Sequence, residues 1–217
     1  MSDKRMLITD FDGTLTRRDF YELVAEHLLP ADAPDFWGEL RAGRRTLFDT
    51  LHDMFAYVPA GEAKFIELTH QAGFEADLVK SVQLLRDAGW EVIVVSAGCR
   101  WYIDRLLREA GVELEVHANP GHIDREGRLI MERPGDSPYQ SVETGVDKAA
   151  VVRKYQAEGY TVAYAGDGPP DLPAALLVSP ELRFARSDLA DRLTRRGEGF
   201  RPFKRWAEIA ETLANDP

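Results

Sequence analysis

The stretch Ile8-Thr9-Asp10-Phe11-Asp12-Gly13-Thr14 carries two carboxylates two positions apart, directly after an apolar run at residues 6–8. If that run is a buried parallel strand, Asp10 and Asp12 point to the same face, where the strand gives way to a loop. Open α/β sheets bind ligands outside the carboxyl ends of parallel strands, so this position favours a functional site. The alternative is an ordinary strand-to-turn junction, in which Asp and Gly serve as turn formers.

Composition and charge narrow the class of protein. The 217-residue chain is long enough for one large domain or for one domain with an insertion. Its net charge of −10 disfavours a nucleic-acid partner. The single cysteine, Cys99, is typical of a reducing compartment. Without a run of about 18 apolar residues or a signal-peptide pattern, the sequence predicts a cytoplasmic protein with no membrane partner, as a monomer or homodimer.

Short apolar runs alternate with helical patterns along most of the chain, which is typical of βαβ units and a parallel sheet. The predicted strands are residues 6–10, 91–96, 114–118, 161–165 and 182–185. The predicted helices are residues 76–88, 100–110 and 146–158, each followed by a glycine suited to a left-handed C-cap. A last helix at residues 203–214 is expected on the flank of the sheet. We therefore expect an α/β fold with a Rossmann-like parallel sheet as its core.

Residues 16–74 interrupt this alternation because they contain no convincing strand. Their amphipathic segments are residues 20–29, 35–41, 46–57 and 62–71. Prolines between these segments predict a small helical bundle inserted into the chain. We therefore divide the chain into a core of residues 1–15 and 75–217 and an inserted helical domain of residues 16–74. Residues 123–130 are expected to form a β-hairpin, which either projects from the edge of the sheet or covers its carboxyl end.

Three further segments place polar residues at strand ends or helix starts. In Ser96-Ala97-Gly98, the hydroxyl and the free N–H groups at the start of the next helix would form an anion site; the alternative is a helix N-cap serine. Lys148 stands early in a helix, against the preference of the helix dipole, which indicates an anionic ligand, although a lone lysine is usually solvated surface. Asp167 and Asp171 follow a predicted strand, in a stretch that a structural turn also explains.

Considered together, these residues point to one kind of chemistry. The four strand-end aspartates would converge on one edge of the sheet, where two close carboxylates repel by about 4 kcal/mol at an effective dielectric constant near 20. Bound Mg²⁺ would relieve that repulsion, and Ser96 and Lys148 would hold the remaining oxygens of a phosphate. A nucleophilic carboxylate beside a second acid can form and hydrolyse an aspartyl-phosphate. The expected partner is therefore a small phosphomonoester.

With these motifs in this order, the sequence resembles the phosphatases of the haloacid dehalogenase (HAD) superfamily over nearly its whole length. The matching motifs are residues 10–14, Ser96, Lys148 and residues 166–171. The resemblance implies the HAD fold, in which the inserted helices form a type C1 cap that closes over the substrate and the hairpin forms a flap. The second acid, at position 12, argues against the dehalogenase branch, which lacks it.

The resemblance also implies a role for each matching residue. Asp10 would be the nucleophile, and Asp12 the general acid for the leaving group and then the base for water. Mg²⁺ would be held by Asp10, Asp167 and the main-chain carbonyl of Asp12, with Asp171 assisting through water or by orienting Lys148. Phosphate binding would fall to Ser96, Ala97, Gly98 and Lys148.

Two branches with small helical caps compete. Phosphoserine phosphatases carry a glutamate seven residues after the second aspartate, where this chain has Asp19, and an Asn where Pro170 stands. They also use a cap arginine, for which only Arg44 and Arg45 lie nearby. Resemblance to the phosphatases of methionine salvage extends to residues 53–59, 184–189 and 203–209, which favours 2-hydroxy-3-keto-5-methylthiopentenyl-1-phosphate as the substrate.

The cap would supply the substrate contacts, and its candidates are Asp19, Arg44, Arg45 and His52. A phosphomutase is an alternative, because the same motifs can return phosphate to a sugar. A non-catalytic protein that retains the fold is a third hypothesis, disfavoured by the complete set of motif residues.

Overall fold

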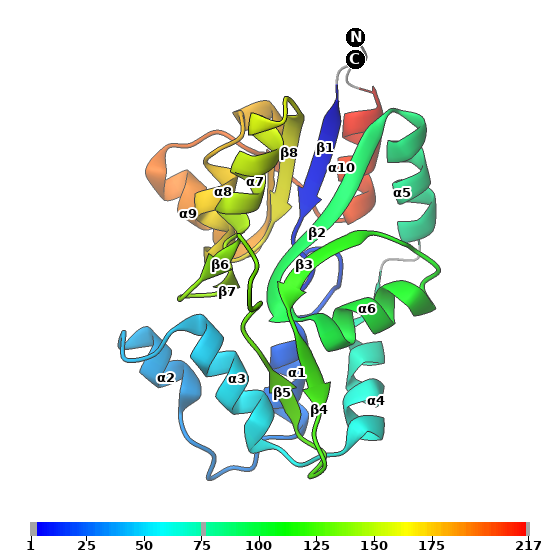
Figure 1. Ribbon diagram of the computed structural model, residues 1–217. Helices are drawn as coiled ribbons and strands as arrows, with labels where there is room; N and C mark the ends of the chain where they lie inside the picture. Colours follow the sequence, from blue (N-terminus) through cyan, green and yellow to red (C-terminus); the bar gives the residue numbers. More distant parts are fainter. Residues whose placement is uncertain (1–3, 75–76, 216–217) are drawn as a thin grey trace.

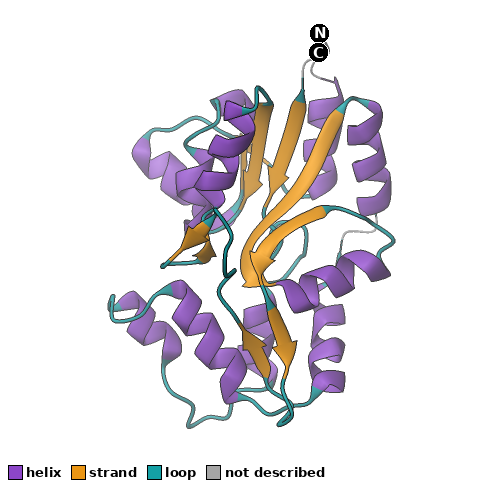
Figure 2. Ribbon diagram, viewed as in Figure 1, coloured by secondary structure: helices purple, strands orange, loops and turns teal. Residues whose placement is uncertain are grey.

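Strand β1 (Arg5–Thr9) lies inside a six-stranded parallel sheet in the computed structural model, which describes residues 4–74 and 77–215 (Figure 2). The spatial order is β10-β9-β8-β1-β2-β3. The other strands are β2 (Trp90–Cys99), β3 (Glu115–Asn119), β8 (Thr161–Gly166), β9 (Arg183–Ala185) and β10 (Arg201–Pro202). All five predicted strands are confirmed. β10 was not predicted, because two residues ending in proline carry no strand pattern.

Both faces of the sheet are covered, as the apolar runs predict. Leu7 packs into one hydrophobic cluster, whereas Met6 and Ile8 pack into another on the opposite face. The first cluster includes residues of α5 (Leu78–Asp87), α6 (Arg100–Glu109) and α10 (Trp206–Asn215), and it continues into the helices of the inserted segment. The second includes residues of α7 (Lys148–Ala157), α8 (Leu172–Ala175) and α9 (Ser187–Arg196). The predicted α/β class is therefore confirmed.

The helix ends follow the local sequence signals. Gly89 and Gly159, which follow α5 and α7, have φ angles of 80° and 83°, a backbone region that glycine enters without strain. The predicted start of α5 at residue 76 lies outside the described residues. α10 lies on the flank of the sheet, where Trp206 Nε1 donates to Thr9 Oγ1 at 3.1 Å and Trp90 Nε1 donates to the carbonyl of Leu213 at 3.1 Å.

Four helices of the inserted segment lie beyond the carboxyl ends of the central strands (Figure 1). They are α1 (Phe20–His27), α2 (Phe36–Arg41), α3 (Leu47–Tyr57) and α4 (Glu62–Ala72), close to the predicted segments. A β-bridge pairs Thr16 with Phe74, so the two ends of the insertion lie side by side. The helical content of residues 16–74 is confirmed, and the division into two domains stays a prediction.

The predicted hairpin consists of β4 (Gly121–Ile123) and β5 (Leu129–Met131), joined by a turn in which Gly127 has a φ of 77°. It extends from the end of β3 and packs against α3, and the Gly61 N–H donates to the Gly127 carbonyl at 2.8 Å. The remaining elements are a short ribbon of β6 (Gln140–Ser141) and β7 (Gly145–Val146) and the 3₁₀ helices η1 (Pro169–Asp171) and η2 (Pro180–Leu182). Across residues 4–74 and 77–215, no helix combines the length and apolar character needed to span a membrane.

Candidate active site

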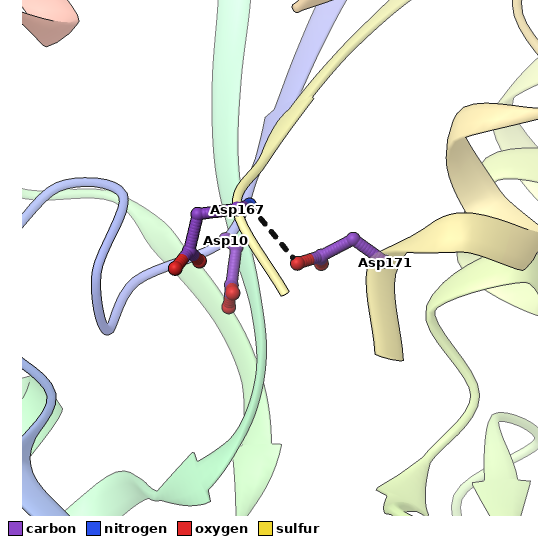
Figure 3. Close-up of side chains that lie close together, drawn as sticks. All are labelled: Asp10, Asp167 and Asp171. Atoms are coloured by element: carbon purple, nitrogen blue, oxygen red, sulfur yellow. Dashed lines mark hydrogen bonds between the residues drawn. The ribbon is translucent and has the colours of Figure 1, made fainter. Parts of the chain in front are cut away.

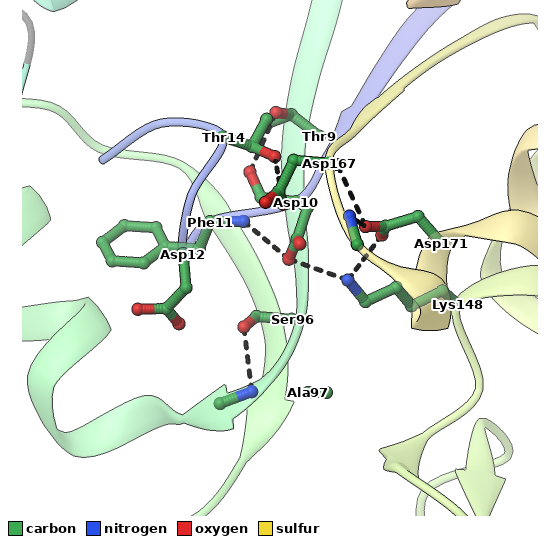
Figure 4. Close-up of polar contacts among 12 residues, drawn as sticks. Thr9, Asp10, Phe11, Asp12, Thr14, Ser96, Ala97, Lys148, Asp167 and Asp171 are labelled. Carbon is green, nitrogen blue, oxygen red and sulfur yellow. Dashed lines mark hydrogen bonds and ion pairs between the residues drawn. The ribbon is translucent and has the colours of Figure 1, made fainter. Parts of the chain in front are cut away.

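Asp10 and Asp12 lie in the turn that follows β1, and their carboxylates have different partners. β1 ends at Thr9. The chain then turns, and the carbonyl of Phe11 accepts hydrogen bonds from the N–H groups of the three residues that follow Gly13. Strand alternation therefore does not extend to Asp12, so the expectation that the two aspartates share a strand face is wrong. Asp10 faces Lys148 (Figure 4). Asp12 bonds instead to residues of α1 and α6.

Lys148 is a buried cation, 4% exposed, at the first position of α7. Its Nζ lies 2.8 Å from Asp10 Oδ1 and 2.6 Å from Asp171 Oδ1. Burial by itself lowers the pKa of Lys148, but the two carboxylates more than offset it and raise that pKa above its ordinary value. The surface alternative for this lysine is therefore excluded.

Asp10, Asp167 and Asp171 bring their carboxylates together at the carboxyl ends of β1 and β8, as Figure 3 shows. One oxygen from each lies within 4.8 Å of the others. Burial, and then the charge of Asp171, raise the pKa of Asp10 well above its usual range, although Lys148 lowers it. The same two causes raise the pKa of Asp167 to about 7. Three of the four aspartates expected to converge therefore do so, and Asp12 is not part of this group.

Asp171 is fully engaged by hydrogen-bond donors. Its Oδ1 accepts from Lys148 Nζ and from the Tyr164 hydroxyl, each at 2.6 Å. Its Oδ2 accepts from the N–H groups of Asp167 at 3.2 Å and Gly168 at 2.9 Å. An ionised carboxylate offers about four lone-pair sites. Asp171 is therefore placed to orient Lys148 rather than to ligate a metal directly.

The carboxylate oxygens of Asp10 and Asp167 that accept no hydrogen bond among the described residues are suitable ligands for a hard dication. Asp10 Oδ1 is taken by Lys148 and by the Phe11 N–H at 2.7 Å, and Asp167 Oδ1 accepts from the Thr14 hydroxyl at 3.1 Å. Within the described residues, no hydrogen bond is recorded to the second oxygen of either carboxylate. Two buried acids with one oxygen each to spare match the oxygen ligands that Mg²⁺ prefers.

The Ser96 segment belongs to a strand and not to a helix start. β2 continues to Cys99, which is the N-cap of α6, so the N-cap alternative for Ser96 is wrong. Ser96 Oγ accepts the Gly98 N–H at 2.9 Å, so that N–H is not free, contrary to expectation. Asn119 Nδ2 donates to the carbonyl of Ala97 at 2.8 Å and ties this segment to the end of β3. Ser96 keeps its O–H as a donor for an anion.

Asp12 and Asp19 are the acids on the side of the inserted helices. Asp12 Oδ1 accepts the Phe20 N–H at 3.1 Å, and Oδ2 accepts the Tyr102 hydroxyl at 2.5 Å. Burial raises the pKa of Asp12 to about 6. Burial, and then the charges of Asp12 and Asp167, raise the pKa of Asp19 to about 8. Asp19 thus lies close enough to Asp12 and Asp167 for their charges to raise its pKa.

Arg44, Arg45 and His52 have partners within the inserted helices. Arg44 forms two hydrogen bonds with Glu39, at 2.8 and 2.7 Å. Arg45 pairs with Asp53, whose other oxygen lies 2.8 Å from His52 Nδ1. No contact between these three residues and the Asp10 cluster is recorded among the described residues, so their role as substrate contacts stays a prediction.

Sequence reasoning did not find several residues that hold the site. They are Tyr102, Asn119, Tyr164 and Arg186. Asn119 ends β3, so its strand-end position was a usable signal, whereas Tyr164 lies within the buried part of β8. Tyr102 lies in an amphipathic helix, and nothing in its local pattern distinguishes it from a core aromatic residue.

Comparison with known proteins bears on this geometry. The family model described as haloacid dehalogenase-like hydrolase matches residues 7–176. The chain belongs to this family. Similar curated proteins are named 2-hydroxy-3-keto-5-methylthiopentenyl-1-phosphate phosphatase: one from Brevibacillus brevis is 22% identical over 88% of this chain and 87% of its own length, and one from Bacillus velezensis is 26% identical over 99% and 92%.

Solved structures of the family share the fold. A HAD family hydrolase from Salmonella enterica has a TM-score of 0.74 and 13% identity, covering 99% of this chain and 72% of its own. A phosphoserine phosphatase with a phospho-aspartyl intermediate analogue has a TM-score of 0.71 and 16% identity, covering 97% and 99%. These likenesses extend through the inserted helices and confirm the predicted HAD fold.

Proposed function

We propose that this HAD hydrolase is a Mg²⁺-dependent phosphomonoesterase that acts through an aspartyl-phosphate on Asp10. The observation that carries the proposal is the buried group of Asp10, Lys148, Asp167 and Asp171 at the carboxyl ends of β1 and β8. Lys148 and the Phe11 N–H both bond to Oδ1 of Asp10 and so fix the orientation of the carboxylate that would attack phosphorus.

In the first half of the reaction, an oxygen of Asp10 bonds to phosphorus while the bond from phosphorus to the leaving oxygen breaks. Asp12 donates a proton to that oxygen, so the product leaves as an alcohol. A pKa of Asp12 raised to about 6 by burial suits this acid for work near neutral pH. Ser96, Ala97, Gly98 and Lys148 would bind the phosphate oxygens.

In the second half, water replaces Asp10 on phosphorus, and Asp12 takes the proton of that water. Asp171 keeps Lys148 directed at the reacting centre through its 2.6 Å contact. The donors that would hold Mg²⁺ are Asp10, Asp167 and the main-chain carbonyl of Asp12; the bound ion would neutralise charge that builds on the phosphoryl oxygens.

We assign residues 16–74 as the cap domain, and residues 1–15 and 75–217 as the catalytic core. α1 begins at Phe20, whose N–H bonds to Asp12, so the cap reaches the acid directly. Closing the cap over a substrate would exclude water during formation of the aspartyl-phosphate. Cytoplasmic localisation and a monomeric or homodimeric state stay predictions.

For the substrate, we propose 2-hydroxy-3-keto-5-methylthiopentenyl-1-phosphate. The names of the relatives from Brevibacillus brevis and Bacillus velezensis support it, at low identity. Phosphoserine is the second candidate, favoured by the phosphoserine phosphatase structures. Its carboxylate needs a cation, and both arginines considered for that task, Arg44 and Arg45, are already paired with carboxylates. Asp19 would contact a donor group of the leaving alcohol.

The mechanism is tested with p-nitrophenyl phosphate. We expect Asp10→Asn, which removes the nucleophile, to lower kcat on the order of 10³-fold or more, and EDTA to abolish activity until Mg²⁺ is restored. Asp191→Asn, at an exposed position of α9, is the matched control and should retain full activity. Turnover that survives both the Asp10 substitution and chelation would exclude the mechanism.

A panel of phosphomonoesters tests the substrate. It contains the salvage enol-phosphate, phosphoserine and sugar phosphates, and kcat/KM is measured for each. A higher kcat/KM for phosphoserine would reverse the order of the two candidates. Isomeric sugar phosphate in place of inorganic phosphate would identify a phosphomutase, and no turnover of any compound would favour a non-catalytic protein.

A further inference from the structure

Asp12 is held by hydrogen bonds from two different elements. The Phe20 N–H of α1 donates to Oδ1 at 3.1 Å, and the Tyr102 hydroxyl of α6 donates to Oδ2 at 2.5 Å. Tyr102 is 2% exposed, and its ring lies 4.3 Å from that of Phe20 and 6.2 Å from that of Phe11. The tyrosine is therefore fixed by packing, and its hydroxyl has a defined position.

The pair of Tyr102 and Asp12 also lies directly against the segment proposed to bind phosphate. A Cβ added at Gly98 would come within 1.9 Å of the Tyr102 hydroxyl oxygen and 2.7 Å of Asp12 Oδ2. Only a residue without a side chain fits there. The tyrosine thus connects the acid on the loop after β1 with the last residues of β2.

We propose that Tyr102 is a positioning residue, which holds the carboxyl group of Asp12 toward the oxygen of the leaving group. This inference rests on the proposed phosphomonoesterase function. As the Asp10–phosphorus bond forms and the bond to the leaving oxygen breaks, the proton moves from the Asp12 carboxyl to that oxygen. Tyr102 keeps its own proton throughout and serves only as a donor to Asp12.

The consequence depends on the leaving group. Without the tyrosine hydroxyl, Asp12 retains a single recorded hydrogen bond from Phe20, at Oδ1, and its carboxyl can rotate away from the substrate. An alkoxide leaves poorly unless it is protonated, whereas p-nitrophenolate leaves without a proton. Loss of alignment should therefore slow alkyl phosphates much more than p-nitrophenyl phosphate.

The experiment compares Tyr102→Phe with the wild-type chain on β-glycerol phosphate and p-nitrophenyl phosphate. We expect kcat/KM, which covers only the steps up to release of the alcohol and not the later hydrolysis of the aspartyl-phosphate, to fall about 10- to 100-fold for the alkyl ester and less than about threefold for the aryl ester. Both rates come from one preparation, so their ratio does not depend on how much of the variant is folded.

Two controls separate positioning from general damage to the site. Tyr164→Phe removes another buried tyrosine hydroxyl, which bonds to Asp171 on the opposite side, and should slow both esters by the same factor. In the second control, Tyr102→Phe is combined with Asp12→Asn. If Tyr102 acts through Asp12, the double variant should be no slower on the alkyl ester than Asp12→Asn alone.

The outcomes are distinct. A wild-type chain that hydrolyses neither ester would overturn the proposed function itself. A wild-type chain that hydrolyses both, with Tyr102→Phe either unchanged or equally slowed on the two esters, would overturn the role of Tyr102 alone. Multiplicative losses in the double variant would also overturn it, because they would show that Tyr102 acts independently of Asp12.

Discussion

At the scale of single residues, the site depends on contacts of charged groups and small residues with partners that are distant in the sequence. Lys148 is surrounded by Asp10 and Asp171 at 2.8 and 2.6 Å, and removing one member of such a buried group leaves an uncompensated charge. The residue types were predictable, because the acids follow strands and the lysine opens a helix. The sequence did not predict that hydrogen bonds would occupy both oxygens of the Asp171 carboxylate, because the donors include Tyr164 and two backbone N–H groups.

Gly13 gives a prediction at this scale. A Cβ there would lie 2.4 Å from Asp167 Oδ2 and 2.7 Å from Asp19 Oδ1, and the backbone has a φ of 65°. We expect Gly13→Ala to cost about 1–2 kcal/mol in the free energy of unfolding through backbone strain, and to lower kcat/KM at least about tenfold by displacing Asp167. Urea denaturation and p-nitrophenyl phosphate hydrolysis measure the two effects.

Gly43→Ala is the matched control, because Gly43 has a φ of 70° but no atom within 4 Å of an added Cβ. It should show the same strain with activity within about twofold of wild type. Equal loss of activity in the two variants would contradict the crowding argument.

At the scale of elements, the loop between β1 and α1 is held by hydrogen bonds from a residue in the C-terminal part of the chain. Arg186, which follows β9, donates to the carbonyls of Gly13 (2.7 Å from Nε), Thr14 (3.2 Å) and Thr16 (3.0 Å). The strand order places β9 next to β8, and that placement brings Arg186 to the loop. Local sequence patterns located β9 and the helix at residues 100–110, but the alternative of an N-cap at Ser96 failed because β2 extends to Cys99 through its parallel pairing with β3.

Removing the Arg186 guanidinium should therefore loosen the loop that carries Asp12. We expect Arg186→Gln to lower the free energy of unfolding by about 2–3 kcal/mol, since several carbonyls lose a charged donor. Thermal and urea denaturation measure the change, and kcat/KM should fall with it. Arg192→Gln, at an exposed position of α9, should stay within about 0.5 kcal/mol of wild type, and a similar loss in both variants would argue against the fastening role.

At the scale of the whole molecule, the acid cluster couples stability to pH and to metal. The folded-state pKa values of Asp12, Asp19 and Asp167 are raised to about 6, 8 and 7. The unfolded value is about 3.9, so the folded state holds these protons more tightly. The stabilisation they give is complete below that value, and it is lost as the pH rises through 6 to 8.

In EDTA, we therefore expect the free energy of unfolding to fall between about pH 5 and pH 8. The slope should be on the order of 1 kcal/mol per pH unit for each titrating carboxyl. Mg²⁺ should flatten this slope, because it binds the ionised carboxylates of the folded state. Urea denaturation at a series of pH values gives the slope.

Asp167→Asn serves as the control, because it removes one titrating group. The difference in slope between this variant and wild type cancels the contributions of other groups, such as His117, whose burial lowers its pKa. A wild-type slope no steeper than that of the variant would show that Asp167 does not titrate as described.

By itself, the sequence determined the α/β class, the helical insertion and the set of acids with one lysine. Hydrophobic periodicity and strand-end position are local properties, and each is readable within a few residues of chain. Only the tertiary structure decided which donors hold those acids. Tyr102 and Asp12 are separated by 90 positions, Thr14 and Asp167 by 153, and Arg186 and Gly13 by 173. Such contacts depend on strand order and helix packing, which no local pattern specifies.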